Sequence, residues 1–381
     1  MKVVIVNCFD PYEQRVDLVY QFFRDKGNEV RVLSSDFRHI EKTKRAEPKE
    51  GYTFFAAEPY HKNLSIQRMK SHIHLSRDIF AYVESQAESI DLLWVLVPPN
   101  TFVKDAAKIK RNHPNIKLVF DVIDMWPETL PVGKIKDYYP IKAWGNIRNN
   151  RINIADAVVT ECSLYQDKLQ KYVPCEKMKT LYLARKEKEF CSVPNLPENT
   201  ISLCYLGSIN NIIDIDEIGR IIQSFKKKSP VVLHIIGTGE KKQDLINMAR
   251  SSGADVVDHG KVYDSKEKQQ IFDSCHFGLN VYKPSVYIGL TMKSIDYFEA
   301  GLPIINTING DTWEFIEKFQ AGINIHTPQN NNIKGSEYEL NIRYEEEMRS
   351  CSRELFDKMF SVSAFENRLK DICALLNLRE D

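Results

Sequence analysis

A cation and a carboxylate stand three positions apart in the segment that runs up to Pro303, at Lys293 and Asp296. Residues three apart in an α-helix share one face, so both side chains can reach the same ligand. Thr291 stands where this helix would begin, and its hydroxyl suits an N-cap that leaves the following amides open to an anion. An ammonium beside open amides suits a diphosphate, and a carboxylate one turn later suits ribose hydroxyls. The segment therefore predicts a nucleotide site.

Loops that end strands in the second half supply further candidates, because open α/β sheets bind ligands beyond the carboxyl ends of their strands. Gly207 and Ser208 close one predicted strand and let backbone amides approach a phosphate. Gly237 opens a Gly-x-Gly turn, but Lys242 stands where a dinucleotide fingerprint needs glycine, so NAD is not expected. Tyr263 ends a third such loop and either stacks on a base or is an ordinary surface residue.

Two carboxylates of the first half, Asp121 and Asp124, follow a predicted strand, and Trp126 comes directly after them. We expect Asp124 to face the ligand, where it orients an acceptor hydroxyl or stabilises positive charge on a sugar ring. The alternative is a helix cap or turn built from Asp and Pro, and it is stronger for Asp121. Arg185, at the end of the last strand of this half, either clamps a diphosphate or is a solvated linker charge.

The elements that must position these residues are indicated by β-branched runs that alternate with helix-length segments, which predicts parallel, doubly wound sheets. A polar stretch with two prolines interrupts the alternation, so we expect domains over residues 1–186 and 200–362 and a last helix over 363–381. Residues 36–63 show no period and are expected to form a long connection such as a lid. The expected strands are Val3–Val6, Glu29–Leu33, Leu92–Val97, Ile116–Val122, Ala157–Thr160, Met178–Leu183, Ile201–Leu206, Val231–Ile236, Asp255–Val257, Phe277–Val281, Pro303–Asn306 and Gly322–Ile325.

Composition narrows the class of protein further. The 381 residues exceed the usual size of one domain, and the formal net charge is zero, with the basic excess in the first half. No nucleic-acid motif accompanies the scattered basic residues, so nucleic acid is not an expected partner. The eight cysteines form no Cys-x-x-Cys pair, which predicts reduced thiols and, without a signal peptide or membrane span, a cytoplasmic protein.

Two further patterns concern metals and membranes. His72 and His74 lack a third ligand, and Asp214 and Asp216 are best explained as the start of a helix, so no metal site is expected. The stretch Lys134–Arg151 mixes cations with aromatic residues. It either rests on an anionic membrane surface or forms a solvated helix face.

The Gly-Leu-Pro segment at 301–303 and the Asp-x-Trp-Pro-Glu segment at 124–128 resemble GT-B glycosyltransferases, especially family 4 enzymes of bacterial surface polysaccharide synthesis. In that family a Glu at the position of Asp296 contacts the nucleotide ribose, a Lys in one variant falls on Lys293, and the loop that contains Val262 contacts the base. Two departures stand out. The second common carboxylate falls on Ile288, and the basic residues that usually follow Gly207 are absent.

The resemblance implies two Rossmann-like domains facing across a cleft, with the last helix crossing back to the first domain. It implies sugar transfer from a nucleotide-sugar, with UDP expected because it is the commonest nucleotide in the family, to a saccharide or lipid-linked oligosaccharide, with retention and without a metal or other cofactor. Asp124, Lys293 and Arg185 would be catalytic, and Asp121, Asp124 and Trp126 would face the acceptor. The protein would work in the cytoplasm or at the inner face of the membrane, and self-association stays open.

Two other functions remain open at this stage. A catalytically weak partner subunit would keep the fold and the nucleotide site, and the departures at Ile288 and after Gly207 motivate it. A GT-B sugar-nucleotide epimerase would need its own acid and base, for which Asp121 and Asp124 are the candidates.

Overall fold

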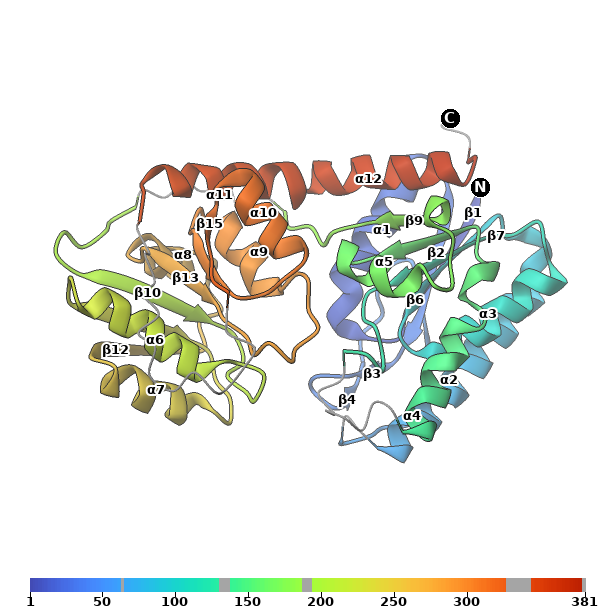
Figure 1. Cartoon of the computed structure of the whole chain (residues 1–381). Coiled ribbons are helices and arrows are strands. Elements are labelled where there is room, and N and C mark those ends of the chain that lie inside the picture. The colour runs from blue at the N-terminus through green and yellow to red at the C-terminus, as the bar shows by residue number, and fades with distance from the viewer. Residues whose placement is uncertain (63–64, 130–137, 187–193, 327–343, 379–381) are drawn as a thin grey trace. The chain divides into compact units, whose positions relative to one another are not determined.

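The computed structural model describes residues 1–62, 65–129, 138–186, 194–326 and 344–378 (Figure 1). The chain divides into two compact units. The first unit comprises Met1–Ala184 and Val362–Asp381, and the second comprises Arg185–Ser361. Among the described residues, no helix is long and apolar enough to cross a membrane.

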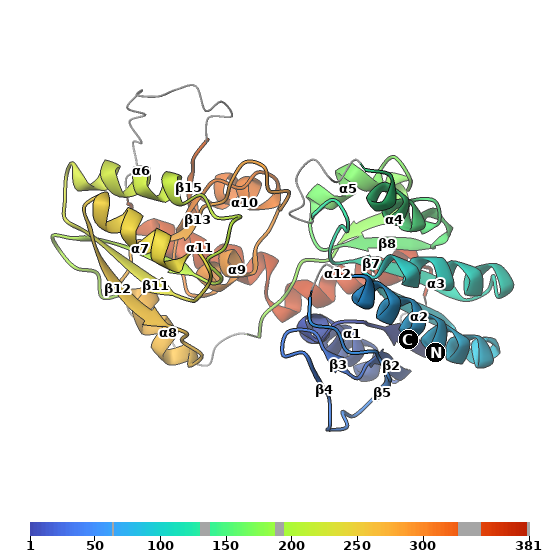
Figure 2. The ribbon, with the colours of Figure 1, turned by 90° about the horizontal axis from the view of Figure 1, so that it is seen from below.

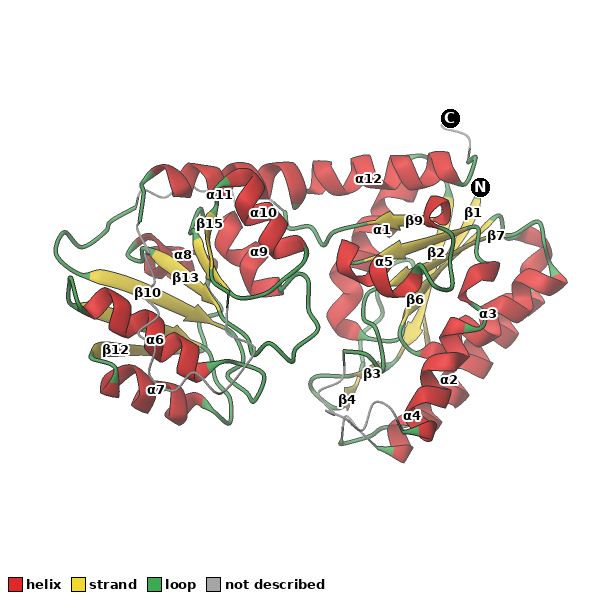
Figure 3. Ribbon diagram, in the orientation of Figure 1, coloured by secondary structure: helices red, strands yellow, loops and turns green. Residues whose placement is uncertain are grey.

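The first unit is built on a seven-stranded parallel sheet with the order β5-β2-β1-β6-β7-β8-β9 (Figure 3). Every residue of the central strand β6 is buried, as expected when helices cover both faces of a parallel sheet. The strands are β1 (Lys2–Val6), β2 (Glu29–Ser35), β5 (Tyr52–Phe55), β6 (Leu92–Val97), β7 (Lys117–Val122), β8 (Ala157–Thr160) and β9 (Met178–Thr180).

Helices cover this sheet. α2, α3 and α4 lie side by side, with α3 in the middle (Figure 2), while α1 packs against α12, the last helix of the chain. Apolar residues of α12, such as Phe365 and Leu369, belong to the same buried cluster as Val3 and Trp94 of the sheet. The helices are α1 (Glu13–Asp25), α2 (Ile66–Ser85), α3 (Asn100–Asn112), α4 (Tyr139–Asn149), α5 (Ser163–Leu169) and α12 (Val362–Leu375).

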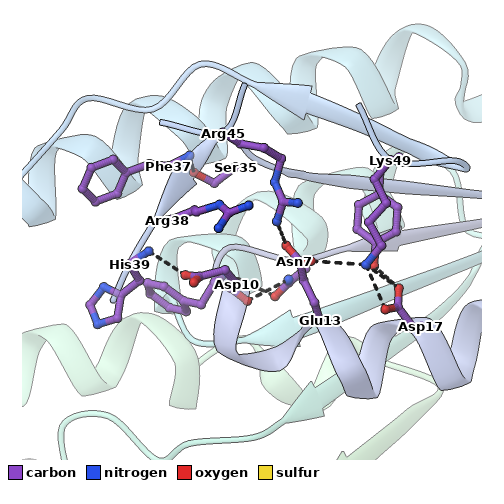
Figure 4. A network of polar contacts seen from close by, with 12 residues as sticks. Asn7, Asp10, Glu13, Asp17, Ser35, Phe37, Arg38, His39, Arg45 and Lys49 are labelled. Atoms are coloured by element: carbon purple, nitrogen blue, oxygen red, sulfur yellow. Dashed lines mark hydrogen bonds and ion pairs between the residues drawn. The ribbon is translucent and has the colours of Figure 1, made fainter. Parts of the chain in front are cut away.

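Residues 36–62 are not the structureless connection that the sequence predicts. They form a two-stranded antiparallel hairpin, β3 (Phe37–Arg38) with β4 (Thr43–Lys44), and then the edge strand β5. Ion pairs fasten this segment to α1 (Figure 4): Arg45 and Lys49 both bind Glu13, and Lys49 Nζ lies 2.8 Å from Asp17. The four-residue strand has no alternation to reveal it, and its pairing with β2 comes from the tertiary fold.

The second unit is built on a six-stranded parallel sheet with the order β12-β11-β10-β13-β14-β15. All the strands that the sequence predicts are present in the two sheets, with ends shifted by a few residues. The strands are β10 (Ile201–Leu206), β11 (Val231–Ile236), β12 (Ala254–Gly260), β13 (Phe277–Asn280), β14 (Ile304–Asn306) and β15 (Gly322–Asn324). The helices are α6 (Ile215–Lys226), α7 (Lys242–Ser251), α8 (Ser265–Asp273), α9 (Met292–Glu299), α10 (Asp311–Phe319) and α11 (Glu347–Met359).

Candidate functional site

Helix α9 begins where the sequence predicts, with Thr291 as its N-cap. The Thr291 hydroxyl accepts a hydrogen bond from the Ser294 amide at 3.2 Å, and Ser294 Oγ accepts one from the Thr291 amide at 3.4 Å. This reciprocal pair is a capping box, which fixes the first turn of the helix. The cap therefore holds Lys293 and Asp296 in place on the helix that follows.

A row of three asparagines, two of them buried, supports the cap through successive hydrogen bonds, and the sequence predictions missed it. Asn280, Asn306 and Asn324 are the last residues of β13, β14 and β15, three neighbouring strands. Asn306 Nδ2 donates to Asn324 Oδ1 at 2.9 Å, and Asn280 Nδ2 donates to Asn306 Oδ1 at 2.8 Å. The Thr291 hydroxyl then donates to Asn280 Oδ1 at 2.9 Å. The recurrence of Asn at three strand ends is the signal that could have revealed this row.

The side chain of Lys293 is buried rather than directed to solvent. Its ammonium lies 4.2 Å from the centre of the Tyr205 ring and 4.6 Å from that of Tyr282, and it has no hydrogen-bond partner among the described residues. Burial lowers the pKa of Lys293 to about 7. The aromatic faces offset part of the cost of this buried charge, since a cation is attracted to the negative face of a ring.

The site in the second unit also contains an ion pair that joins two predicted residues. Arg185 Nε lies 3.4 Å from Asp296 Oδ1, and both side chains are largely buried. The backbone amide of Arg185 donates to Phe360 O at 2.9 Å, which anchors this residue to the end of α11. The structure thus brings Arg185 and Asp296 together within the second unit, although they were predicted from separate segments.

The loops after β10 and β11 pack closely on each other, and this decides what their glycines do. A Cβ at Gly237 would lie 2.0 Å from the carbonyl oxygen of Gly207, so only glycine fits there. The Gly207 amide donates to Ile236 O at 2.8 Å. The expectation that this amide meets a phosphate is therefore wrong for this conformation, whereas Ser208 is exposed.

The third loop, after β12, is the most open of the predicted donor-side segments. Tyr263 is 85% exposed and Val262 is half-buried. The Tyr263 ring is thus free to stack on a planar ligand, but no contact of the described residues orients it toward one. The two interpretations given for this tyrosine both stand.

In the first unit, Asp124 is mostly buried among polar and aromatic side chains. Trp126 Nε1 donates to Asp124 Oδ2 at 2.6 Å, and the Thr129 hydroxyl donates to Asp124 Oδ1. Burial raises the pKa of the Asp124 carboxyl, while these hydrogen bonds act in the opposite direction. The carboxylate is therefore held in one orientation beyond the carboxyl end of β7.

Arg68 and His72, on the inner face of α2, complete this cluster and were not predicted. The Arg68 guanidinium lies 4.3 Å from the centre of the Trp126 ring and 5.2 Å from that of Phe9. The His72 ring stacks on Trp126 with centroids 6.3 Å apart, and its Nε2 has no hydrogen-bond partner among the described residues. Burial and the nearby Arg68 charge lower the pKa of His72 well below its usual value, so the ring is neutral. A cation on a helix of mixed polarity gives no sequence signal for such a cluster.

Asp121, by contrast, belongs to the core of the first unit. It is fully buried and accepts two hydrogen bonds from Arg15, at 2.8 and 2.7 Å, and one from Trp94 Nε1 at 3.0 Å. The prediction that Asp121 faces an acceptor is corrected on this ground, because every described contact of the carboxylate lies inside the fold.

One cation of the basic stretch Lys134–Arg151 belongs to the interior of the first unit. Arg148 is fully buried, with an ion pair of 2.6 Å to Glu128 and a hydrogen bond of 3.0 Å to Trp126 O. These two contacts hold the Trp-Pro segment at residues 126–128 in place. Lys134 and Lys136 lie outside the described residues, and Lys142 is exposed.

Among the residues that the structure describes, no group of three or more His, Cys, Asp and Glu side chains could hold a metal ion. Asp214 caps α6 by accepting a hydrogen bond of 3.0 Å from the Glu217 amide, so its prediction as helix-start chemistry is confirmed.

Two Rossmann-like units, each a parallel sheet with candidate ligand residues beyond the carboxyl ends of its strands, define the GT-B class. The C-terminal part of the chain is similar to a particular family within that class. Residues 200–334 match the family model of group 1 glycosyl transferases. This match and the fold support a glycosyltransferase enzyme.

Solved structures with the same fold cover nearly the whole chain at low sequence identity. The apo form of the lipopolysaccharide outer core galactosyltransferase WaaB is 13% identical with a TM-score of 0.67, and the match covers 98% of this chain and 99% of that one. Anabaena HepE in complex with UDP is 12% identical with a TM-score of 0.62, over 98% of this chain and 100% of that one. Sucrose-phosphate synthase from Thermosynechococcus elongatus is 11% identical with a TM-score of 0.67, over 99% of each chain. Among proteins of curated function, the sequence has no significant match.

Proposed function

We propose that this protein transfers a sugar from a UDP-sugar, with retention of configuration and without a metal, to a saccharide or lipid-linked oligosaccharide in surface polysaccharide synthesis. The observation that carries the proposal is the capped start of α9, which bears Lys293 and Asp296 within the region that matches group 1 glycosyl transferases, with Arg185 paired to Asp296. UDP is the nucleotide of the HepE complexes, which share this fold.

In this proposal the second unit holds the donor. Asp296 binds the ribose, which requires its pair with Arg185 to open or to be shared with the ligand. Arg185 then faces the diphosphate, where negative charge develops as the glycosidic bond breaks, and Lys293 must turn out from between Tyr205 and Tyr282 to join it. Preorganised cations there stabilise the transition state more than the bound donor.

In this proposal the first unit holds the acceptor, and the Asp124 carboxylate faces the acceptor hydroxyl that receives the sugar. The hydrogen bonds from Trp126 and Thr129 fix the carboxylate, so it can orient an acceptor hydroxyl without reorganising. The protein would work in the cytoplasm at the inner face of the membrane, where a lipid-linked acceptor is presented.

Thermal unfolding of the purified protein with UDP, GDP, ADP and CMP tests the donor assignment. A ligand at 100 times its dissociation constant stabilises a protein by about 2.7 kcal/mol, so a shift with UDP alone is the expected result. A selective shift with another nucleotide would replace UDP, and no shift with any nucleotide or nucleotide-sugar would contradict the donor site. Incubation with the UDP-sugar and a lipid-linked acceptor then tests transfer, and conversion of the UDP-sugar without any acceptor would indicate an epimerase instead.

A second candidate is a catalytically weak partner subunit. Its specific support is the buried Lys293 ammonium, which has no hydrogen-bond partner among the described residues, together with Ile288 in place of a carboxylate. This candidate predicts UDP-sugar binding without transfer by the protein alone. Transfer that appears only when a companion glycosyltransferase is added would favour it over the enzyme.

A further inference from the structure

Large apolar side chains are exposed in three separate segments of the first unit. One is the turn between β3 and β4, another is the first half of α2, and the third is the start of α4. Relative exposures in this set range from 45% to 84%. We call these residues the apolar rim. The apolar rim consists of Ile40, Ile66, Met69, Ile73, Tyr138 and Tyr139.

The topology of the sheet places these three segments at the same edge. In a parallel sheet, the connection after a strand begins at the carboxyl end of that strand. The β3–β4 hairpin follows β2, α2 follows β5, and α4 follows β7, and these strands all run in parallel. Figure 1 shows the hairpin and the start of α4 at the same lower end of the first unit. The apolar rim thus surrounds the edge beyond which Asp124 and Trp126 lie.

Helix α2 is apolar on two sides over its first turns, which packing inside the unit does not explain. Its inner face buries Leu75, Ile79 and Val83. Ile66, Met69 and Ile73 lie on the outer side, within about 60° of one another around the helix axis. Further along the same helix the exposed positions are mainly polar, including Arg77 and Asp78. Single exposed apolar residues are ordinary, whereas a grouped set marks an interaction surface.

Lysines accompany the apolar rim. Lys62 precedes α2, Lys70 lies between the apolar positions of that helix, and Lys142 lies in the first turns of α4. All three are exposed, and none lies within ion-pair distance of a carboxylate in the part of the chain that the structure describes. Exposed apolar side chains interspersed with lysines suit a surface that is apolar beneath and negatively charged at its face, as in an anionic bilayer.

We propose that the apolar rim docks on an anionic phospholipid bilayer, with the apolar side chains in the headgroup region and the lysines against lipid phosphates. The inference deepens the proposed function and rests on its lipid-linked acceptor, because docking here brings the edge that carries Asp124 to the surface in which such an acceptor resides. Of the stretch Lys134–Arg151, only Tyr138, Tyr139 and Lys142 are assigned to this docking surface, whereas Arg148 is buried.

Sedimentation with vesicles tests the docking directly, with no donor or acceptor present. The parent protein should bind vesicles of phosphatidylcholine with 30% phosphatidylglycerol, and bind less in high salt or to phosphatidylcholine alone. The variant Ile66→Ser/Met69→Ser/Ile73→Ser should bind the anionic vesicles at least tenfold more weakly. Lys62→Glu/Lys70→Glu should lose binding to a similar extent. The matched control is Tyr172→Ser, which removes an exposed apolar side chain of the same unit outside the rim and should bind like the parent.

Unfolding temperature and the UDP-induced shift, measured on each variant, separate docking from folding and from the donor site. Unchanged values in the triple serine variant, with vesicle binding lost, support the proposal. It is overturned if the parent does not bind anionic vesicles or if the triple variant binds like the parent. It is also overturned if the parent is a dimer that the triple variant dissolves while vesicle binding is absent, because the rim is then a contact between copies. A missing UDP shift with intact vesicle binding would contradict the proposed function alone.

Discussion

Arg185 Nε lies 3.4 Å from Asp296 Oδ1, and the two residues are 111 positions apart in the sequence. The pair ties the first residue of the second unit to the helix whose start forms the candidate donor site. An ion pair at this place orients the carboxylate before a ligand arrives. A ligand that hydrogen-bonds to the Asp296 carboxylate must therefore break or share its ion pair with Arg185.

A double-mutant cycle on UDP binding measures this relationship. We expect Arg185→Ala and Asp296→Ala each to weaken UDP binding about tenfold, and the double variant to be weaker by less than the product. Residues in direct contact typically show coupling of about 0.5 to 3 kcal/mol. Titration calorimetry on the four proteins gives the coupling, and strictly additive losses would show that the pair does not act as a unit.

Removal of the Lys293 ammonium should slow transfer and stabilise the fold at the same time. Loss of one preorganised group at a developing charge commonly costs about 10² to 10³ in rate, and Lys293→Met is expected to lose that much. The variant also removes a buried amine whose folded-state pKa is about 7. Activity within a few-fold of the parent would remove Lys293 from the mechanism.

The gain in stability should depend on pH in a defined direction. The folded-state pKa of Lys293 is depressed from 10.5 to about 7, so between these values the unfolded chain holds more protons and the parent becomes more stable as pH rises. The advantage of Lys293→Met is therefore largest below pH 7. At pH 9 it should be smaller by roughly 2 to 3 kcal/mol, since one pKa unit corresponds to about 1.4 kcal/mol. Urea unfolding at pH 6 and pH 9 measures the difference, and an equal advantage at both values would contradict this account.

The same titration should make UDP binding sensitive to pH. A diphosphate beside the amine favours its charged form, so the pKa in the complex is higher than in the free protein. Above pH 7 the free protein must take up a proton on binding, and affinity should fall by up to about tenfold per pH unit until the pKa of the complex is reached. Calorimetry in two buffers with different ionisation enthalpies detects the proton, and Lys293→Met should show no such uptake from this site.

The fold was predictable because its signals are local and repeated. Buried strands such as Leu92–Val97 are runs of apolar and β-branched residues, and the helix start at Thr291 has the residue type that capping requires. Strand β5 was missed because four residues without alternation carry no period, and only pairing with β2 makes them a strand. Between the hairpin and β5, ion pairs of Arg45 and Lys49 fasten the segment to α1, and no local sequence pattern indicates them.

The candidate site was less predictable than the fold, because the direction of a side chain is set by its tertiary neighbours. The spacing of Lys293 and Asp296 correctly placed both on one short helix, but it did not show that Tyr205 and Tyr282 enclose the amine. Similarly, Arg68 lies on a helix 56 positions before Asp124 in a segment with no motif. The asparagines that end three neighbouring strands are an exception, since that repetition is visible once the strand ends are known.

Asp121 should behave as a core residue in a variant test. Asp121→Ala leaves the buried Arg15 guanidinium without its carboxylate partner, and breaking one side of a buried ion pair commonly costs about 3 to 5 kcal/mol. We expect a loss of unfolding free energy of that size in urea unfolding. A paired change of Arg15 and Asp121 to apolar residues of similar volume should recover part of the loss, and an unchanged midpoint for Asp121→Ala would contradict the core assignment.

Asp124, only three positions later, should give the opposite result. Asp124→Asn preserves the shape of the side chain and an oxygen that can accept from Trp126 or Thr129, and it removes a carboxyl whose pKa is raised by burial. The free energy of unfolding should therefore stay within about 0.5 kcal/mol of the parent value or rise, as for substitutions that break no buried ion pair. If the carboxylate orients the acceptor, transfer falls about a hundredfold while the UDP-induced thermal shift is unchanged, because the proposed donor site lies in the other unit. Thr129→Val is the matched control, since it removes one hydrogen bond to the carboxylate and should lower the rate by a smaller factor. Full activity of Asp124→Asn with an intact fold would assign this carboxylate to the turn that it begins.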